Sequence, residues 1–273
     1  MASVVERLCE GPTRAPGAEI QIAGLSKSYR TASGDMVHAL QDIALTIAGG
    51  EFVSIVGPSG CGKSTLLKIL AALTSPSTGT VTIAAAPPER SQRDIGFVFQ
   101  EATLLPWLTV LRNVLVPADV AHVPRAKMQP RAMALLDLVG LTGFHDKYPN
   151  ELSGGMQQRA AICRALLRNP RTLLMDEPFG ALDALTRDHM NIELLRIWET
   201  QRSTIVFVTH SITEAVLLSD RIVVMSPRPG RVIEQVRVNL PRPRGIAMVN
   251  TAEFGTYAQH VRFLLDGPSA PRE

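Results

Sequence analysis

A glycine-rich run over residues 57–65, Gly-Pro-Ser-Gly-Cys-Gly-Lys-Ser-Thr, has the residue types and the spacing that bind phosphate groups. Glycines let the backbone wrap closely around an anion, while successive N–H groups and the following helix start supply positive potential. Lys63 can reach the β- and γ-phosphates of a nucleotide, and the Ser64 hydroxyl can ligate Mg²⁺. Average composition gives about one chance match per hundred chains of this length. The run therefore predicts a nucleoside triphosphate site made of Gly57, Pro58, Ser59, Gly60, Cys61, Gly62, Lys63, Ser64 and Thr65.

Two adjacent carboxylates follow a short apolar run at residues 172–175. Neighbouring side chains of a strand point to opposite faces, so we expect Asp176 and Glu177 to have different tasks. Asp176 suits contact with Mg²⁺, directly or through water, and Glu177 suits polarising the water that attacks the γ-phosphate. Asp-Glu-Pro after a strand is by itself usually a solvated loop. Its occurrence together with the phosphate loop favours the catalytic interpretation.

A second anion site is predicted at Leu-Ser-Gly-Gly, residues 152–155. Ser153 is placed as the N-cap of a helix, and Gly154 and Gly155 leave backbone amides open at its start. Many Ser-Gly-Gly turns bind nothing, so this motif is weak in isolation. It gains meaning only from its order along the chain with the two motifs above.

The elements that must position these residues alternate between strands and helices. Apolar runs of four or five residues between helices are typical of parallel strands buried on both faces. They predict strands at 52–56, 81–83, 95–99, 172–175, 204–208 and 222–225, and helices at 64–73, 184–201 and 212–218. From 104 to 168 the pattern is almost purely helical, with stops expected at Pro117, Pro124, Pro130 and Pro149. Residues 250–266 predict a further helix that packs on the core, with Asn250 and Glu253 at capping-box spacing.

Composition excludes several classes of protein. The chain has 273 residues, 45% of them hydrophobic, and a formal net charge of +3, which is too small to indicate a nucleic-acid partner. No apolar stretch has the roughly 20 residues that a membrane span needs. The N-terminal residues lack the pattern of a secretory signal. Three cysteines without metal-ligand spacing indicate a reducing, cytoplasmic setting.

The three motifs occur in an order that is specific when taken together: phosphate loop, Leu-Ser-Gly-Gly-x-Gln, and a strand ending in Asp-Glu. In this order the chain resembles the ATP-binding subunit of an ABC transporter over roughly residues 20–240. The resemblance implies a P-loop NTPase (RecA-like) α/β core with an inserted helical subdomain, at about 101–165, and an antiparallel β edge. The expected organisation is a flexible tail at 1–18, the ATP-binding domain at 19–245, and a C-terminal helix and tail at 246–273.

Four further residues take roles from this resemblance alone, since each type by itself is usually packing or solvated. Tyr29 matches the aromatic residue that stacks on adenine. Gln100 matches the glutamine that contacts Mg²⁺ or water and connects to the helical subdomain. Asp183, in Ala-Leu-Asp, matches the loop that crosses to the partner subunit, and His210 matches the histidine that contacts the γ-phosphate.

The resemblance also implies cofactors and partners. In the family, the serine and glycines at 153–155 face phosphates held by another subunit, so we expect two copies to close on ATP and Mg²⁺ and to open after hydrolysis. Membrane-spanning permease subunits, and indirectly a solute-binding protein, are the other expected partners. The expected location is the cytoplasmic face of the plasma (inner) membrane.

An ATP-binding subunit of this family does not contact the transported solute, so its residues do not identify that solute directly. The stretches at 100–107, 179–183 and 226–230 resemble the nitrate, sulfonate and taurine importer branch. Pro106, Trp107 and Leu108 are candidates for the groove that receives a permease helix, and packing of Trp107 in the core is an equal alternative. A non-transport ATPase in DNA repair or translation, and the ATPase of an exporter, stay open. Cys61 is expected to be a partly exposed thiol at a helix N-terminus.

Overall fold

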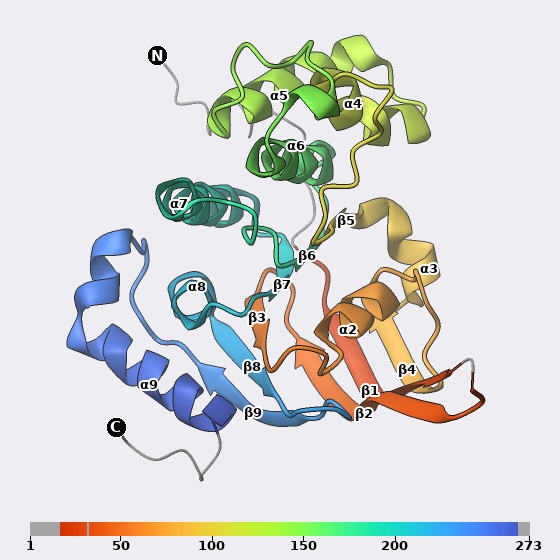
Figure 1. Cartoon of the computed structure of the whole chain (residues 1–273), viewed down its shortest axis with the longest axis vertical. Coiled ribbons are helices and arrows are strands. Elements are labelled where there is room, and N and C mark those ends of the chain that lie inside the picture. Colours follow the sequence, from red (N-terminus) through yellow and green to blue (C-terminus); the bar gives the residue numbers. More distant parts are fainter. Residues whose placement is uncertain (1–16, 32, 267–273) are drawn as a thin grey trace. The chain divides into compact units, whose positions relative to one another are not determined.

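The computed structural model describes residues 17–31 and 33–266 (Figure 1). The chain divides into two compact units. The first unit is Arg93–Ser203, and the second is made of Gly17–Gln92 and the residues from Thr204 onward. Most of the predicted tail at 1–18 and the last residues of 246–273 lie outside the described residues. Within the described ranges no helix combines the length and the hydropathy needed to cross a membrane.

A buried parallel sheet forms the centre of the second unit. Strand β3 (Phe52–Val56) pairs in parallel with β7 (Thr204–Val208) and with β8 (Arg221–Met225), and β9 (Val232–Arg237) adds an antiparallel edge to β8. Every residue of β3 and β7 is buried, which is why these strands are continuous apolar runs without alternation. The predicted strands at 52–56 and 204–208 are confirmed. The helices of this unit are α2 (Lys63–Leu70), α3 (Pro88–Ser91), α8 (Ile212–Leu218), a 3₁₀ turn η3 (Ile246–Asn250) and α9 (Ala252–Asp266).

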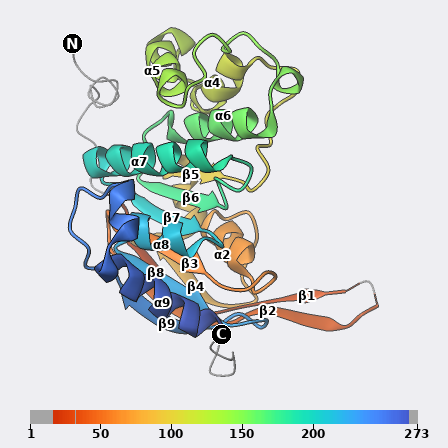
Figure 2. The same ribbon diagram turned by 60° about the vertical axis from the view of Figure 1, so that its left-hand side comes forward.

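A second, antiparallel sheet in this unit has the strand order β2-β1-β4. It contains β1 (Ile20–Arg30), β2 (Met36–Ile47) and β4 (Thr78–Ile83). Figure 2 shows β1 and β2 extending as a long hairpin beyond β4. The pairing of β1 with β2 shifts register at three points after Ile22, so the strict two-residue alternation that would reveal these strands in the sequence is lost.

The first unit joins a pair of parallel strands, β5 (Ile95–Val98) and β6 (Thr172–Asp176), to a group of helices. These are α4 (Val110–Val120), α5 (Arg125–Leu138), the 3₁₀ turn η2 (Pro149–Glu151), α6 (Gly154–Leu166) and α7 (Ala184–Gln201), while η1 (Gln92–Asp94) precedes β5. Figure 1 shows α4, α5 and α6 grouped together, in colours from yellow-green to green.

Two of the four prolines expected to stop helices do not do so. Pro124 precedes α5 and Pro149 begins η2, as expected, but Pro117 lies inside α4 and Pro130 inside α5. A proline inside a helix removes one backbone hydrogen bond and costs stability. The residues around both prolines nevertheless bury apolar side chains, among them Val114 and Ala118 in α4 and Leu135 in α5, and this packing favours continuation of the helix.

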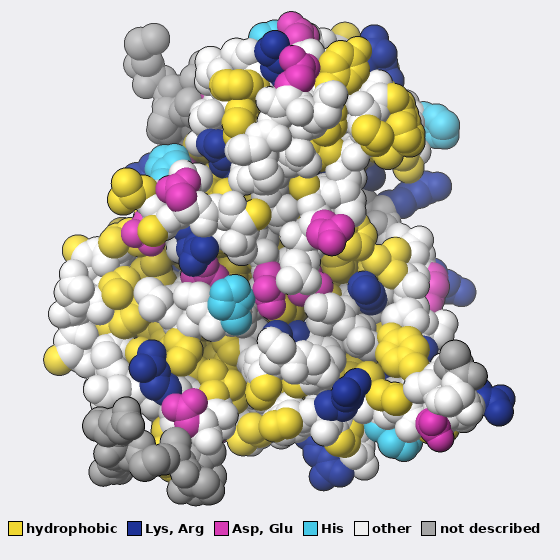
Figure 3. All heavy atoms as spheres, viewed as in Figure 1, with side chains coloured by type: hydrophobic (Ala, Val, Ile, Leu, Met, Phe, Trp, Pro, Cys, Tyr) yellow, Lys and Arg dark blue, Asp and Glu magenta, His cyan; other side chains and the backbone are white. Residues whose placement is uncertain are grey.

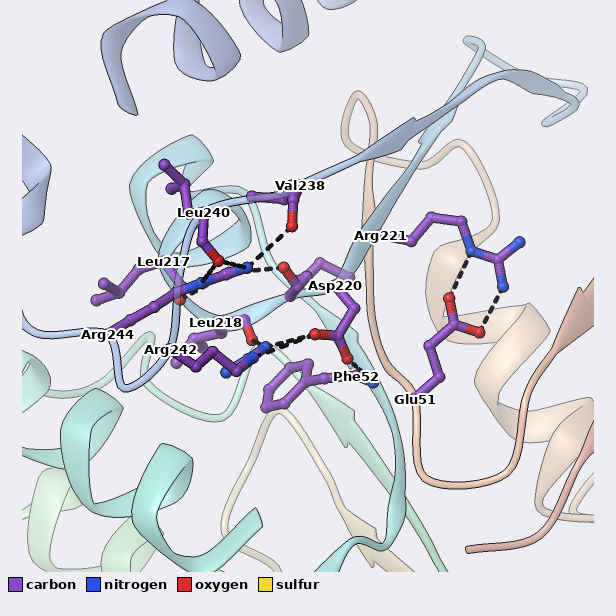
Figure 4. A network of polar contacts seen from close by, with 12 residues as sticks. Glu51, Phe52, Leu217, Leu218, Asp220, Arg221, Val238, Leu240, Arg242 and Arg244 are labelled. Atoms are coloured by element: carbon purple, nitrogen blue, oxygen red, sulfur yellow. Dashed lines mark hydrogen bonds and ion pairs between the residues drawn. The ribbon is translucent and has the colours of Figure 1, made fainter. Parts of the chain in front are cut away.

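The segment that follows β9 is fastened to α8 by the buried side chain of Arg244 (Figure 4). The last carbonyls of a helix have no partners within the helix. The Arg244 guanidinium supplies donors to these carbonyls and to two beyond β9, at 2.7–3.3 Å, its acceptors being Val216, Leu217, Ser219, Val238 and Leu240. One side chain therefore closes α8 and fixes the path of the C-terminal segment.

Two ion pairs in the same region hold the start of β3 (Figure 4). Arg242 Nη2 lies 2.8 Å from Asp220 Oδ1, and the other oxygen of Asp220 accepts from the N–H of Phe52 at 3.0 Å. Arg221 forms a bidentate pair with Glu51, with distances of 2.8 and 2.7 Å. The strand that leads into the phosphate loop is thus anchored at its first residue.

Replacing Arg244 with methionine is expected to lower the free energy of unfolding by about 2–4 kcal/mol, because several buried carbonyls lose a donor at once. Urea denaturation followed by circular dichroism measures this loss. The matched control is Arg237→Met, at an exposed position of β9, which should change stability by less than about 0.5 kcal/mol. Equal losses in the two variants would contradict the structural role of Arg244.

Candidate functional site

The phosphate loop lies in the second unit, between the end of β3 and the start of α2. The Lys63 side chain is only 7% exposed, and its ammonium donates to the carbonyls of Gly57 at 2.7 Å and Pro58 at 3.0 Å. Gly62 precedes α2 with a φ of 103°, which disfavours any other residue. A Cβ at Gly62 would also lie 2.6 Å from Leu40 Cδ2. The loop is therefore curled around its own lysine, and Gly57 and Gly62 stand where there is no room for a side chain.

The other members of the loop differ in exposure. Ser59 and Gly60 are exposed at its tip, and Ser64 and Thr65 are half-buried in the first turn of α2. Cys61, in contrast, is 1% exposed, so the expectation of a partly exposed thiol is wrong. Its Sγ is directed inward, toward Gly57, where an added Cβ would come within 2.9 Å of it.

Tyr29 and His210 belong to the same unit as the phosphate loop. Tyr29 lies on β1, is 42% exposed, and has the Lys27 ammonium 5.0 Å from its ring centroid. An exposed, electron-rich ring of this kind is available for stacking on a base. His210 follows β7 and is exposed.

The turn that carries His210 is held by a buried carboxylate that the sequence analysis did not single out. The Thr209 hydroxyl donates to the carboxylate of Glu214 and accepts from the N–H of Ser211. The Ser211 hydroxyl in turn accepts from the N–H of Glu214. Glu214 is 6% exposed. The Ser-x-x-Glu spacing at the start of α8 is the signal that would have identified it.

The two adjacent acids lie in the first unit, at the end of β6. Asp176 is the last strand residue and is 5% exposed, whereas Glu177 has a φ of 45°. Strand alternation therefore does not extend to Glu177, which is oriented by a left-handed backbone that non-glycine residues rarely adopt. Gln100 Nε2 donates to Glu177 Oε2 at 3.3 Å. The structure thus brings Gln100 and Glu177, two of the predicted site residues, into hydrogen-bond contact.

The Ser-Gly-Gly motif opens α6 in the same unit. The Ser153 hydroxyl accepts from the N–H of Met156 at 3.3 Å, so the predicted N-cap is confirmed. Gly154 has open space where a side chain would stand, whereas a Cβ on Gly155 would meet the carbonyl oxygen of Ala181 at 3.2 Å. Asp183 caps α7, and its hydrogen bonds from Thr186 lower the pKa of its carboxyl group. The start of α6 and the loop ending at Asp183 therefore lie side by side.

Two long side chains of α6 connect the helices to the segment around Gln100. Gln158 is 1% exposed and donates to the carbonyl of Phe99 at 2.9 Å. Arg164 donates to the carbonyls of Ala102 and Thr103 at 3.1 and 2.9 Å. These hydrogen bonds join residues about 60 positions apart, so no local sequence pattern indicates them. Gln158 and Arg164 were therefore not predicted.

Comparisons with known proteins extend over most of the chain. Residues 40–180 match the family described as ABC transporter. An uncharacterized ABC transporter ATP-binding protein of Methanocaldococcus jannaschii is 45% identical over 86% of this chain and 88% of that protein. The aliphatic sulfonates import ATP-binding protein SsuB of Bacillus cereus is 46% identical over 82% of this chain and 88% of its own length.

The solved structures that resemble this chain belong to the same family. The cassette MJ0796, in a dimeric post-hydrolysis state bound to ADP and phosphate, has a TM-score of 0.73 and is 35% identical, covering 81% of this chain and 100% of that one. A second dimeric structure of MJ0796, described as a bacterial ABC transporter cassette, has a TM-score of 0.75, 36% identity and the same coverage. The likeness therefore includes both units and not the phosphate loop alone.

Proposed function

Because the chain belongs to the ABC transporter family, as an ATP-binding subunit that hydrolyses ATP, we propose that it powers the import of a small solute. The family, the P-loop NTPase fold and the ATPase activity expected from the sequence are confirmed. The observation that carries the import proposal is the 46% identity to the sulfonate import subunit of Bacillus cereus. Nitrate, sulfonates and taurine are the proposed class of cargo.

The active form that we propose is a dimer of this chain closed on ATP. The dimeric MJ0796 structures support it. In the proposed dimer the phosphate loop of one copy holds the triphosphate, and Ser153, Gly154 and Gly155 of the other copy direct the amides at the start of α6 toward the same phosphates. Asp183, which lies beside that helix start, faces the partner copy.

Each proposed site residue has a physical task in the reaction. Glu177, hydrogen-bonded to Gln100, accepts a proton from the attacking water, whose oxygen bonds to the γ-phosphorus while the bond from that phosphorus to the bridging oxygen breaks. ADP and phosphate then leave. Lys63 and the loop amides stabilise the phosphate charge, His210 contacts the γ-phosphate, and Tyr29 stacks on adenine.

The residues proposed for Mg²⁺ suit that ion. Ser64, Gln100 and Asp176 offer hydroxyl, amide and carboxylate oxygens, the hard donors that Mg²⁺ prefers, and Mg²⁺ commonly takes its other ligands from phosphates and water. When bound, the ion would neutralise charge on the β- and γ-phosphates.

A rigid turn in the first unit is the proposed contact with the membrane-spanning permease. Trp107 is 69% exposed, so its packing in the core is excluded. The buried side chain of Asn113 accepts from the N–H of Leu105 and donates to the carbonyls of Leu105, Leu108 and Thr109, which fixes the turn around Trp107. Figure 3 shows hydrophobic side chains exposed over the helices α4 and α5, at the top of the view. Docking here would place the chain peripherally on the cytoplasmic face of the inner membrane.

Replacing Trp107 with alanine is expected to leave the ATPase rate of the isolated chain within about twofold while reducing co-purification with the permease at least tenfold, since large aromatic anchors dominate interfaces. Affinity purification from solubilised membranes and a phosphate-release assay measure the two quantities. Phe263→Ala, at a 57% exposed position of α9, is the matched control and should keep the permease. Equal retention of the permease by Trp107→Ala would contradict the docking proposal.

The direction and cargo of transport are tested in vesicles that contain this chain with its co-purified membrane subunits. ATP is supplied on the side of this chain, and the co-isolated solute-binding protein and labelled taurine, nitrate or an alkanesulfonate are supplied on the opposite side. The labelled solute should then move toward the side of this chain. Movement away from that side would identify an exporter. An ATPase that yields no membrane subunits and is stimulated by DNA or ribosomes would overturn transport altogether.

A further inference from the structure

A short turn between β8 and β9, residues 226–231, is closed by one serine. The N–H of Ser226 donates to the carbonyl of Arg231 at 2.9 Å, and the Ser226 hydroxyl accepts from the N–H of Arg231 at 3.0 Å. The same hydroxyl lies 2.9 Å from the carbonyl oxygen of Pro227 and 3.1 Å from that of Pro229. The turn is therefore fixed by its own hydrogen bonds.

The turn is also anchored to β2 on both sides of Gly230. The N–H of Gly230 donates to the carbonyl of Ala39 at 3.0 Å, and its carbonyl accepts from the N–H of Gln41 at 2.9 Å. The Arg231 guanidinium donates to Gln41 Oε1 at 2.7 Å. Because these bonds hold Gly230 against β2, the turn has little freedom to move away from its other neighbours.

One of these neighbours is the phosphate loop. A Cβ on Gly230 would stand 2.0 Å from the carbonyl oxygen of Cys61 and 2.9 Å from Met225 Cε. The φ of Gly230 is outside the left-handed range, so space and not backbone conformation requires glycine here. The methionine end can move aside, but the Cys61 carbonyl belongs to the loop backbone.

We propose that Gly230 is a positioning residue of the nucleotide site, which sets the place of the Cys61 peptide and, through it, of the loop amides that hold phosphate. The proposal rests on the function proposed for residues 57–65. Any side chain at Gly230 must displace the Cys61 carbonyl by about 1 Å to reach an acceptable contact, since real Cβ atoms do not approach closer than 3.0 Å. Amides aimed at an anion lose much of their effect when displaced by that distance.

Gly230→Ala is the direct test, with Gly245→Ala as its matched control. Gly245 has extended backbone and no atom within 4 Å of the point where a Cβ would stand, so its substitution should change nothing. Gly230→Ala should raise the Kd for ATP, measured by calorimetry, and the KM for ATP by about 10–100-fold, with kcat at saturating ATP within about threefold. A Kd within twofold of the wild-type value would overturn the proposal.

Thiol labelling gives a second readout that needs no nucleotide. Maleimide modification of Cys61, followed by peptide mass spectrometry, should be faster in Gly230→Ala than in the wild type, while Cys163, which is 0% exposed in the first unit, should label at the wild-type rate. Faster labelling of both cysteines would mean general loosening and would overturn a positioning role. If the wild type failed to bind ATP, the proposed function would fall, whereas selective labelling of Cys61 would still support the contact.

If Gly230→Ala does not fold, a variant that adds no atoms to the turn can test the proposal instead. Ser226→Ala removes the hydroxyl that closes the turn and adds no volume. It should raise the KM for ATP by about threefold and label faster at Cys61 alone. Wild-type behaviour of Ser226→Ala in both measurements would then overturn the proposal.

Discussion

Glu177→Gln is expected to lower kcat for ATP hydrolysis by about 10²–10⁴-fold, the usual contribution of a positioned general base, with ATP affinity within about threefold. Glutamine has nearly the same size and can keep a hydrogen bond with Gln100, but it cannot accept the proton of the attacking water. Because ATP then persists between the two copies, the variant should also form a stable dimer in the presence of ATP.

Phosphate release under single-turnover conditions and light scattering measure the two effects. Glu253→Gln, at an exposed position of α9, removes a carboxylate elsewhere and should match the wild type in both assays. Near-normal turnover of Glu177→Gln would contradict its role as the base. A slow variant that stays monomeric with ATP would instead contradict the proposed dimer.

Lys63→Ala is expected to weaken ATP binding by about 10–150-fold, since each hydrogen bond from a charged group to a buried acceptor contributes about 1.5–3 kcal/mol. The ammonium already lies within the loop, 2.7 Å from the Gly57 carbonyl, so it needs little rearrangement to meet the phosphates. Titration calorimetry with ATP measures the change in Kd.

The control for this variant lies one turn further along the same helix. Lys68 is exposed on α2, and Lys68→Ala removes an equal charge from the same element without touching the loop. An equal loss of affinity in both variants would show that net charge, and not contact with the phosphates, explains the effect. Lys63→Ala also removes the donor to the carbonyls of Gly57 and Pro58. Comparing the thermal unfolding of this variant with that of the wild type checks that the fold is not destabilised.

The sequence predicted those parts of the fold whose signals are local. Strands buried on both faces are continuous apolar runs, so β3 and β7 were placed to the residue. The strands β1 and β2 were missed because bulges interrupt their alternation. At the C-terminal helix, Asn250 was expected to begin a capping box, but the N–H of Phe254 donates to the hydroxyl of Thr251, which makes Thr251 the capping residue.

The same distinction holds for the candidate site. Residues of contiguous motifs, such as Ser153 at the start of α6, could be assigned from spacing because their contacts are within one turn of helix. Other residues contact segments that come near them only in the folded chain, so their spacing in the sequence does not indicate their roles. These residues are Gln158, Asn113 and Gly230. Cys61 was expected to be partly exposed because spacing shows that it precedes a helix, but not that its Sγ is directed toward Gly57 in the folded loop.

The unit that holds the phosphate loop is discontinuous, and this affects how the chain folds during synthesis. Strand β3 is flanked by β7 and β8, and both leave the ribosome about 150 residues after it. At about 5–20 residues per second, the edges of β3 stay unpaired for about 7–30 s, while the continuous unit Arg93–Ser203 is made in one piece. Translation speed over the middle of the message therefore sets how long both edges of β3 stay unpaired, and unpaired strand edges favour aggregation.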